Sequence, residues 1–121
     1  MYIQYKNNPC HIDTGDCVIR AISIITGMTW KKIYAELCVQ GYEYCGWGNE
    51  NRIWTKYLKS IGFKQTYVNK ELTVSEFAET HTKGKYVLGT GNHAVAVVDS
   101  NWIDSWDSGN EQVIYFFTES I

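Results

Sequence analysis

The sequence has a single proline, no long apolar run and almost no excess of charge of either sign. No stretch approaches the roughly 20 apolar residues that a membrane-spanning helix needs, and the first residues lack the apolar core of a signal peptide. We therefore expect a cytoplasmic protein with no membrane partner. Eleven Lys and Arg stand against thirteen Asp and Glu, and the basic residues are scattered, so nucleic acid is not an expected partner either.

Closely spaced cysteine pairs of the kind that form zinc sites are also absent, although the chain has four cysteines. In a chain without a secretion signal we expect free thiols and not a disulfide framework. The only dense group of residue types that bind metals is Cys10, His11 and Cys17, and its spacing is not that of a zinc site. We therefore expect neither a metal ion nor a cofactor.

Apolar residues make up 45% of the chain and aromatic residues 15%, enough to bury the core of one domain over residues 1–121. Apolar side chains at helical spacing predict helices over residues 16–26, 30–39, 50–60 and 73–82, with Gly41 ending the second. Apolar and alternating runs predict strands over residues 63–68, 85–90, 93–99, 101–106 and 111–118. Because short turns join the last strands, we predict an α+β domain with N-terminal helices packed on a C-terminal antiparallel sheet.

Residues 14–21 join a turn-forming segment to an apolar helical pattern, with Cys17 on the first turn of the helix. A thiol there faces unpaired backbone N–H groups and the positive end of the helix dipole, which favour the thiolate. Cys17 is therefore a candidate nucleophile, although it also lies in line with Ala21 and could simply fill the core. We expect the side chain of Thr14 or Asp16 to cap this helix, a role that would keep the Asp16 carboxylate from opposing the thiolate.

His93 opens a predicted strand and is a candidate base for the thiol. A two-residue turn at positions 99 and 100 would pair Val95 with Asp104 and place Asp104 on the His93 face, about 7–8 Å away along the diagonal. A three-residue turn would move Asp104 to the opposite face. Taken singly, His93 also fits a structural role, and Asp104 also fits the turn-rich segment that follows it.

Three segments, residues 14–21 (TGDCVIRA), 92–99 (NHAVAVVD) and 103–107 (IDSWD), resemble the small papain-fold proteins carried by phages and mobile elements. They also resemble, more remotely, the papain-like cysteine peptidases, in which Cys precedes His and then Asp or Asn. The resemblance covers nearly the whole chain. It implies a papain-like fold with Cys17 as nucleophile, His93 as base and then acid, and Asp104 as the group that orients the imidazole.

The resemblance also implies an oxyanion hole formed by the backbone N–H of Cys17 and a side chain six residues earlier. The family usually has Gln or Asn at that earlier position, whereas this chain has His11. An imidazole N–H can donate a similar hydrogen bond, so His11 is the candidate second donor.

The leading hypothesis is a cysteine hydrolase that cleaves an amide, peptide or isopeptide bond of a peptide or protein substrate without a cofactor. Acyl transfer to an amine or thiol would use the same residues. A third hypothesis is a non-catalytic binding or inhibitory module that holds another protein in its groove. Residues 41–49, with three glycines and three aromatics, fit either a wall of such a groove or a packed cover of the core.

Overall fold

The computed structural model describes residues 1–119, in which four helices pack on both faces of one six-stranded sheet. The helices are α1 (Cys17–Thr26), α2 (Trp30–Tyr44), α3 (Asn51–Ser60) and α4 (Val74–Thr80). The strands are β1 (Tyr2–Gln4), β2 (Phe63–Tyr67), β3 (Lys85–Gly89), β4 (Ala94–Val98), β5 (Asn101–Asp104) and β6 (Tyr115–Glu119). They lie in the order β1-β5-β4-β3-β6-β2. None of these helices is long and apolar enough to cross a membrane.

The α+β class is confirmed, but the sheet is mixed and not purely antiparallel. β1 lies at one edge and pairs in parallel with β5, with Tyr2 opposite Trp102, while the other strand pairs are antiparallel. The prediction of a C-terminal antiparallel sheet was wrong on this point. A strand of three residues is too short to show a period in the sequence, and its partner β5 lies far along the chain.

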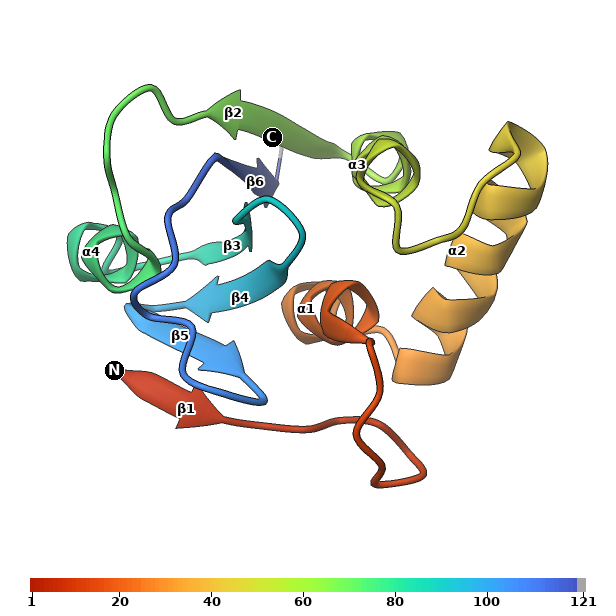
Figure 1. The fold of residues 1–121 in the computed structure, drawn as a ribbon, viewed down its shortest axis with the longest axis horizontal. Coiled ribbons are helices and arrows are strands. Elements are labelled where there is room, and N and C mark those ends of the chain that lie inside the picture. The colour runs from red at the N-terminus through yellow and green to blue at the C-terminus, as the bar shows by residue number, and fades with distance from the viewer. Residues whose placement is uncertain (120–121) are drawn as a thin grey trace.

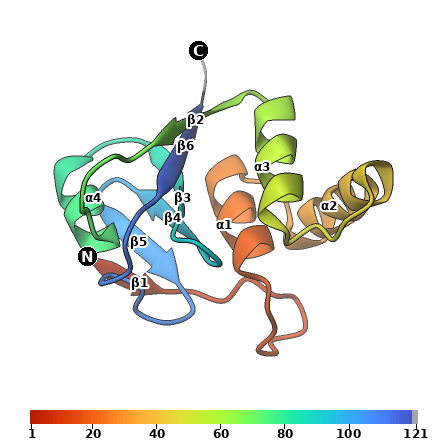
Figure 2. The same cartoon turned by 45° about the horizontal axis from the view of Figure 1, so that its top comes forward.

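β4 lies inside the sheet, and its alternating side chains divide the core between two layers. Ala94 and Ala96 belong to the cluster that contains α1, α2 and α3. Val95 and Val97 belong to the cluster that contains α4. Figure 1 shows α4 on one face of the sheet and α1 on the other, and Figure 2 shows α1 between the sheet and the pair α2 and α3. Small alanines on the α1 face let the helix pack closely on β4. The first residue of α1, Cys17, lies beside the first residue of β4, Ala94.

The turn between β4 and β5 has the two-residue form that the placement of Asp104 required. Asp99 and Ser100 both have positive φ, 46° and 73°, as in the type I′ turns that suit the twist of a hairpin. Val97 pairs with Trp102 in the predicted register. The register is therefore confirmed.

α2 continues through Gly41, which we predicted would end it. Its last residue is Tyr44, and Cys45 caps it in the left-handed conformation with its N–H on the Gly41 carbonyl. Gly41 meets a packing requirement instead, because a Cβ there would overlap the carbonyl oxygen of Gly46. Its lack of a side chain lets the loop after α2 fold back onto the helix.

Gly41→Ala is therefore expected to lower the free energy of unfolding by about 1–3 kcal/mol, the usual cost of overpacking. In a helix interior with free space the same change would instead stabilise the helix by about 1 kcal/mol, because alanine has a higher helix propensity than glycine. Urea denaturation measures the difference. Gly15→Ala is the matched control, because nothing lies within 4 Å of a Cβ at Gly15. A Gly41→Ala protein as stable as the parent would contradict the close approach.

Candidate active site

Cys17 is the first residue of α1 and lies where this helix meets the start of β4. Its thiol lies beside the His93 ring and the backbone N–H of Ala94, close enough for both to lower its pKa. The rest of the side chain packs against the core cluster around α1. Both interpretations of Cys17 therefore apply, since its carbon atoms fill space in the core while its sulfur faces a base.

His93 joins Cys17 to Asp104. Its Nε2 lies 2.6 Å from Oδ2 of Asp104, which leaves Nδ1 as the ring nitrogen for the thiol. With its side chain only 11% exposed, the imidazole is held on both sides. The structure thus brings the three residues predicted as catalytic together, with His93 between Cys17 and Asp104.

Asp104 is 1% exposed and accepts four hydrogen bonds. Oδ2 accepts from His93 and from the Ser108 hydroxyl at 2.6 Å, and Oδ1 accepts from Arg20 and from the Ser105 N–H, both at 2.8 Å. Burial raises the pKa of the Asp104 carboxyl, but the hydrogen bonds from His93, Ser108 and Ser105 and the charge of His93 outweigh it and lower the pKa. Asp104 therefore stays ionised and fixes the orientation of the imidazole.

Sequence reasoning missed Arg20, which is 4% exposed and carries the only charge in α1. Its guanidinium lies 2.6 Å from Oδ1 of Asp16 and 2.8 Å from Oδ1 of Asp104. The indole N–H of Trp30 donates to the other Asp16 oxygen at 2.9 Å. The Asp16–Arg20 spacing of four residues in an otherwise apolar helix is the sequence signal that could have indicated this pair.

Asp16 occupies the N-cap position of α1, but its side chain makes no capping hydrogen bond. The prediction that Thr14 or Asp16 caps the helix through its side chain was wrong, because both Asp16 oxygens are bound by Arg20 and Trp30. The Asp16 side chain therefore does not occupy the first N–H groups of α1. The Cys17 N–H is one of these groups, which have no partner within the helix.

The charges of the site favour a thiolate. Burial raises the pKa of the Cys17 thiol, but the hydrogen bonds from His93 and the Ala94 N–H and the charges of His93 and Arg20 outweigh it and lower the pKa. Burial lowers the pKa of His93, yet its hydrogen bonds and charge interactions with Asp104 and Cys17 raise it to about 9. Below a pH of about 9 His93 stays protonated, and the lowered pKa of the Cys17 thiol favours the thiolate beside it, so the site favours a thiolate–imidazolium pair.

His11 does not reach this site. It lies in the loop before α1 with a positive φ of 55°, and its N–H bonds to the Asn8 carbonyl at 3.0 Å, which closes a tight turn that leaves the His11 side chain exposed. In the described residues the His11 side chain makes no hydrogen bond to Cys17. The oxyanion donor predicted at position 11 is therefore not brought to the thiol, while the Cys17 N–H is.

All four cysteines are free thiols, as predicted. Within residues 1–119, no three His, Cys, Asp or Glu side chains lie close enough together to hold a metal ion. Cys10, His11 and Cys17, close in sequence, thus do not form a metal site.

One aromatic residue, Trp106, and the loop between α2 and α3 lie beside His93. The Trp106 ring lies 5.0 Å from the His93 ring, centroid to centroid, and is half exposed. On the helix side, the Asn51 amide at the start of α3 donates to the Gly91 carbonyl at 2.7 Å, two residues before His93. The loop between α2 and α3 therefore ends beside the segment that carries His93.

A scan against protein-family models and searches of curated proteins and of solved structures find no match for this chain. The interpretation of the site therefore depends on its geometry. A thiol at a helix start, an imidazole and a buried carboxylate in hydrogen-bonded series are the groups that nucleophilic cysteine catalysis requires.

Proposed function

We propose that this protein is a cysteine hydrolase of papain-like fold that cleaves an amide, peptide or isopeptide bond. The observation that carries the proposal is the series Cys17–His93–Asp104, closed by the 2.6 Å contact between His93 Nε2 and Asp104 Oδ2. The lowered pKa of the Cys17 thiol supports it. The papain-like interpretation is supported by the nucleophile at the start of a helix that packs on the sheet and by the base and acid on that sheet.

In the proposed reaction the Cys17 thiolate attacks the carbonyl carbon of the scissile bond. The oxyanion accepts hydrogen bonds from N–H groups at the start of α1, including that of Cys17. The His93 imidazolium gives its proton to the leaving nitrogen as the C–N bond breaks, which leaves a thioester. His93 then takes a proton from water, which attacks the thioester and releases the acid and the thiolate. Asp104 orients the ring and stabilises the imidazolium.

A non-catalytic binding module is the second candidate function, and one observation favours it. The side chain at position 11 is exposed and makes no hydrogen bond to Cys17 within the described residues, so the side-chain donor that the resemblance implied is not in place at the thiol. Under this alternative the groove beside Cys17 holds a protein segment without cleaving it.

The deciding experiment is the pH dependence of alkylation by iodoacetamide, followed for each cysteine by peptide mass spectrometry. Only the thiolate reacts, and a lowered pKa means that the thiolate forms at lower pH. Cys17 is therefore expected to reach its maximal rate at a pH below that of the exposed Cys10, Cys38 and Cys45. Hydrolysis also needs the protonated His93 as acid, so it is expected to fall as the pH rises through about 9, whereas alkylation is not.

His93→Ala removes the hydrogen bond and the charge that lower the Cys17 pKa and leaves burial, so its alkylation curve should move to higher pH. His81→Ala is the matched control, because His81 stacks on Phe77 in α4, far from the thiol in the fold. An unchanged Cys17 curve in His93→Ala would refute the activated pair. An activated thiol in a protein that hydrolyses no peptide would favour the binding module.

A further inference from the structure

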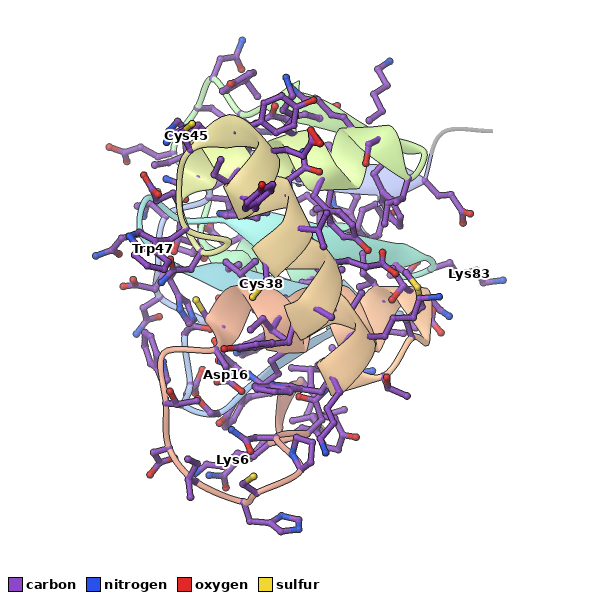
Figure 3. All side chains as sticks on the ribbon, turned by 90° about the vertical axis from the view of Figure 1, so that its right-hand side faces the viewer. Lys6, Asp16, Cys38, Cys45, Trp47 and Lys83 are labelled. Carbon is purple, nitrogen blue, oxygen red and sulfur yellow. The ribbon has the colours of Figure 1, made fainter. Side chains whose placement is uncertain are left out.

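A cavity of about 250 Å³ lies between the start of α1, α2 and the loop that follows α2. Gly15 and Asp16, the two residues immediately before the nucleophile, form part of its wall. The remaining wall is largely apolar and includes Ile19, Trp30, Tyr34 and Leu37. In Figure 3, Asp16, Cys38 and Trp47, which all line the cavity, lie on the same side of α2.

The loop that closes the cavity, residues 45–50, is held by its neighbours through its backbone. The Arg52 guanidinium donates to the carbonyls of Tyr44 and Cys45, both at 2.8 Å. The Glu50 carboxylate accepts from the Trp47 N–H, and the Glu50 N–H donates to the Trp47 carbonyl at 3.0 Å. None of these contacts uses the Trp47 indole.

The Trp47 side chain is 77% exposed although it lines the cavity. Gly48 brings this part of the loop against α2, since a Cβ there would lie 2.8 Å from the Leu37 Cβ. An exposed indole on a loop already ordered by other groups loses little entropy when a ligand covers it, which is why such residues dominate binding energies. The arrangement favours a role for Trp47 in binding.

We propose that this cavity is a substrate subsite that takes one aromatic or large aliphatic side chain next to the scissile bond. The inference rests on the proposed function and names its substrate class, a peptide with an apolar residue at that position. The volume is below the 300–1,000 Å³ of pockets for whole small ligands, which suits a single side chain.

The charges of the wall disfavour charged side chains. Asp16 is the one ionisable carboxylate among the lining residues, and both of its oxygens are engaged by Arg20 and Trp30. A substrate Lys or Arg would therefore find no free acceptor charge there, and a Glu would find no cation. Apolar side chains gain free energy from the same walls.

The test compares N-acetyl-phenylalanyl, N-acetyl-glycyl and N-acetyl-glutamyl chloromethyl ketones, which carry the same reactive group, in their rates of alkylating Cys17. Burying an aromatic side chain is expected to make the phenylalanyl compound about tenfold or more faster than the other two. In Trp47→Ala the ratio of phenylalanyl to glycyl rates should fall toward one. Tyr42→Ala is the matched control, because Tyr42 is an 87% exposed aromatic that does not line the cavity, and its ratio should stay as in the parent.

Equal rates for the three ketones, or a faster glutamyl compound, would overturn the subsite. The proposed hydrolase would still stand in that case if iodoacetamide alkylates Cys17 at a lower pH than the exposed cysteines. If Cys17 proves unreactive, titration with N-acetyl-phenylalaninamide and N-acetyl-glycinamide still decides the inference. The indole N–H resonances of Trp30 and Trp47 should then move with the first compound only, and no movement refutes the subsite. If the parent protein dimerises and Trp47→Ala does not, the cavity is occupied by a second copy of the chain, and the proposed subsite is refuted.

Discussion

Replacing Asp104 with Asn is expected to reduce the proposed hydrolysis by about 10³–10⁴-fold. The amide keeps an oxygen for Arg20 and Ser105 but presents an NH₂ group where Oδ2 accepts from His93 Nε2. His93 would then bond through an unprotonated Nε2 and carry its proton on Nδ1, the nitrogen that faces Cys17. A ring in this tautomer cannot take a proton from the thiol. Turnover of a peptide substrate, with Cys17 alkylation as a second readout, measures the effect.

Asp107→Asn is the matched control for this prediction. Asp107→Asn removes the same charge three residues later in the chain. The Asp107 carboxylate accepts hydrogen bonds from Trp102 Nε1 and the Gly109 N–H and makes none with His93. Its hydrolysis rate is expected to stay near that of the parent. Circular dichroism verifies that Asp104→Asn folds, and a folded Asp104→Asn protein with unchanged turnover and an unchanged Cys17 alkylation curve would remove Asp104 from the mechanism.

Replacing Arg20 with Met is expected to lower the free energy of unfolding by about 3–5 kcal/mol, the cost of leaving buried charges without their partner. Asp16 and Asp104, 6% and 1% exposed, would both lose the guanidinium. The alkylation curve of Cys17 should also move to higher pH, because the Arg20 charge is among the causes that lower its pKa. Denaturant unfolding and iodoacetamide alkylation measure the two effects.

Two further variants separate the buried network from a general effect of charge. Lys6→Met breaks an exposed ion pair with Asp13, at 2.7 Å, and is expected to cost less than about 1 kcal/mol. Arg20→Lys keeps the charge but cannot reach both carboxylates with one planar fork, so it should fall between Arg20→Met and the parent. If Arg20→Met were no less stable than Lys6→Met, the network would have no structural role.

The Asp16–Arg20–Asp104 network also links the two halves of the site. It fastens the start of α1 to the end of β5, and so fixes the distance between the Cys17 thiol and the imidazole that Asp104 orients. Trp30 holds Asp16 through its indole N–H, while Trp30 itself lines the cavity beside Asp16. A ligand in the cavity would therefore touch a residue, Trp30, that is linked to Asp104 through Asp16 and Arg20.

The sequence determined the features that depend on local patterns. Helical spacing of apolar residues placed α1 and α3 close to their observed bounds, because an amphipathic helix must bury one face. The sequence also offered a two-residue turn at Asp99 and Ser100 as one of two alternatives, and the positive φ of both residues decides for it, since such a turn allows only one register. From that register the pairing of His93 with Asp104 followed, and so did the candidate series with Cys17.

Only the tertiary structure decided the features that depend on contacts distant in sequence. β1 joins β5 across about a hundred residues, Gly41 serves the approach of a loop and not a helix end, and Asp16 gives its carboxylate to Arg20 and Trp30 instead of capping α1. His11 is exposed in a tight turn, although the resemblance had implied that it would donate at the thiol. Local propensity is worth only tenths of a kcal/mol to about 1 kcal/mol per residue, whereas pairing a buried charge is worth several. Where the two compete, as at Asp16, the buried partner decides.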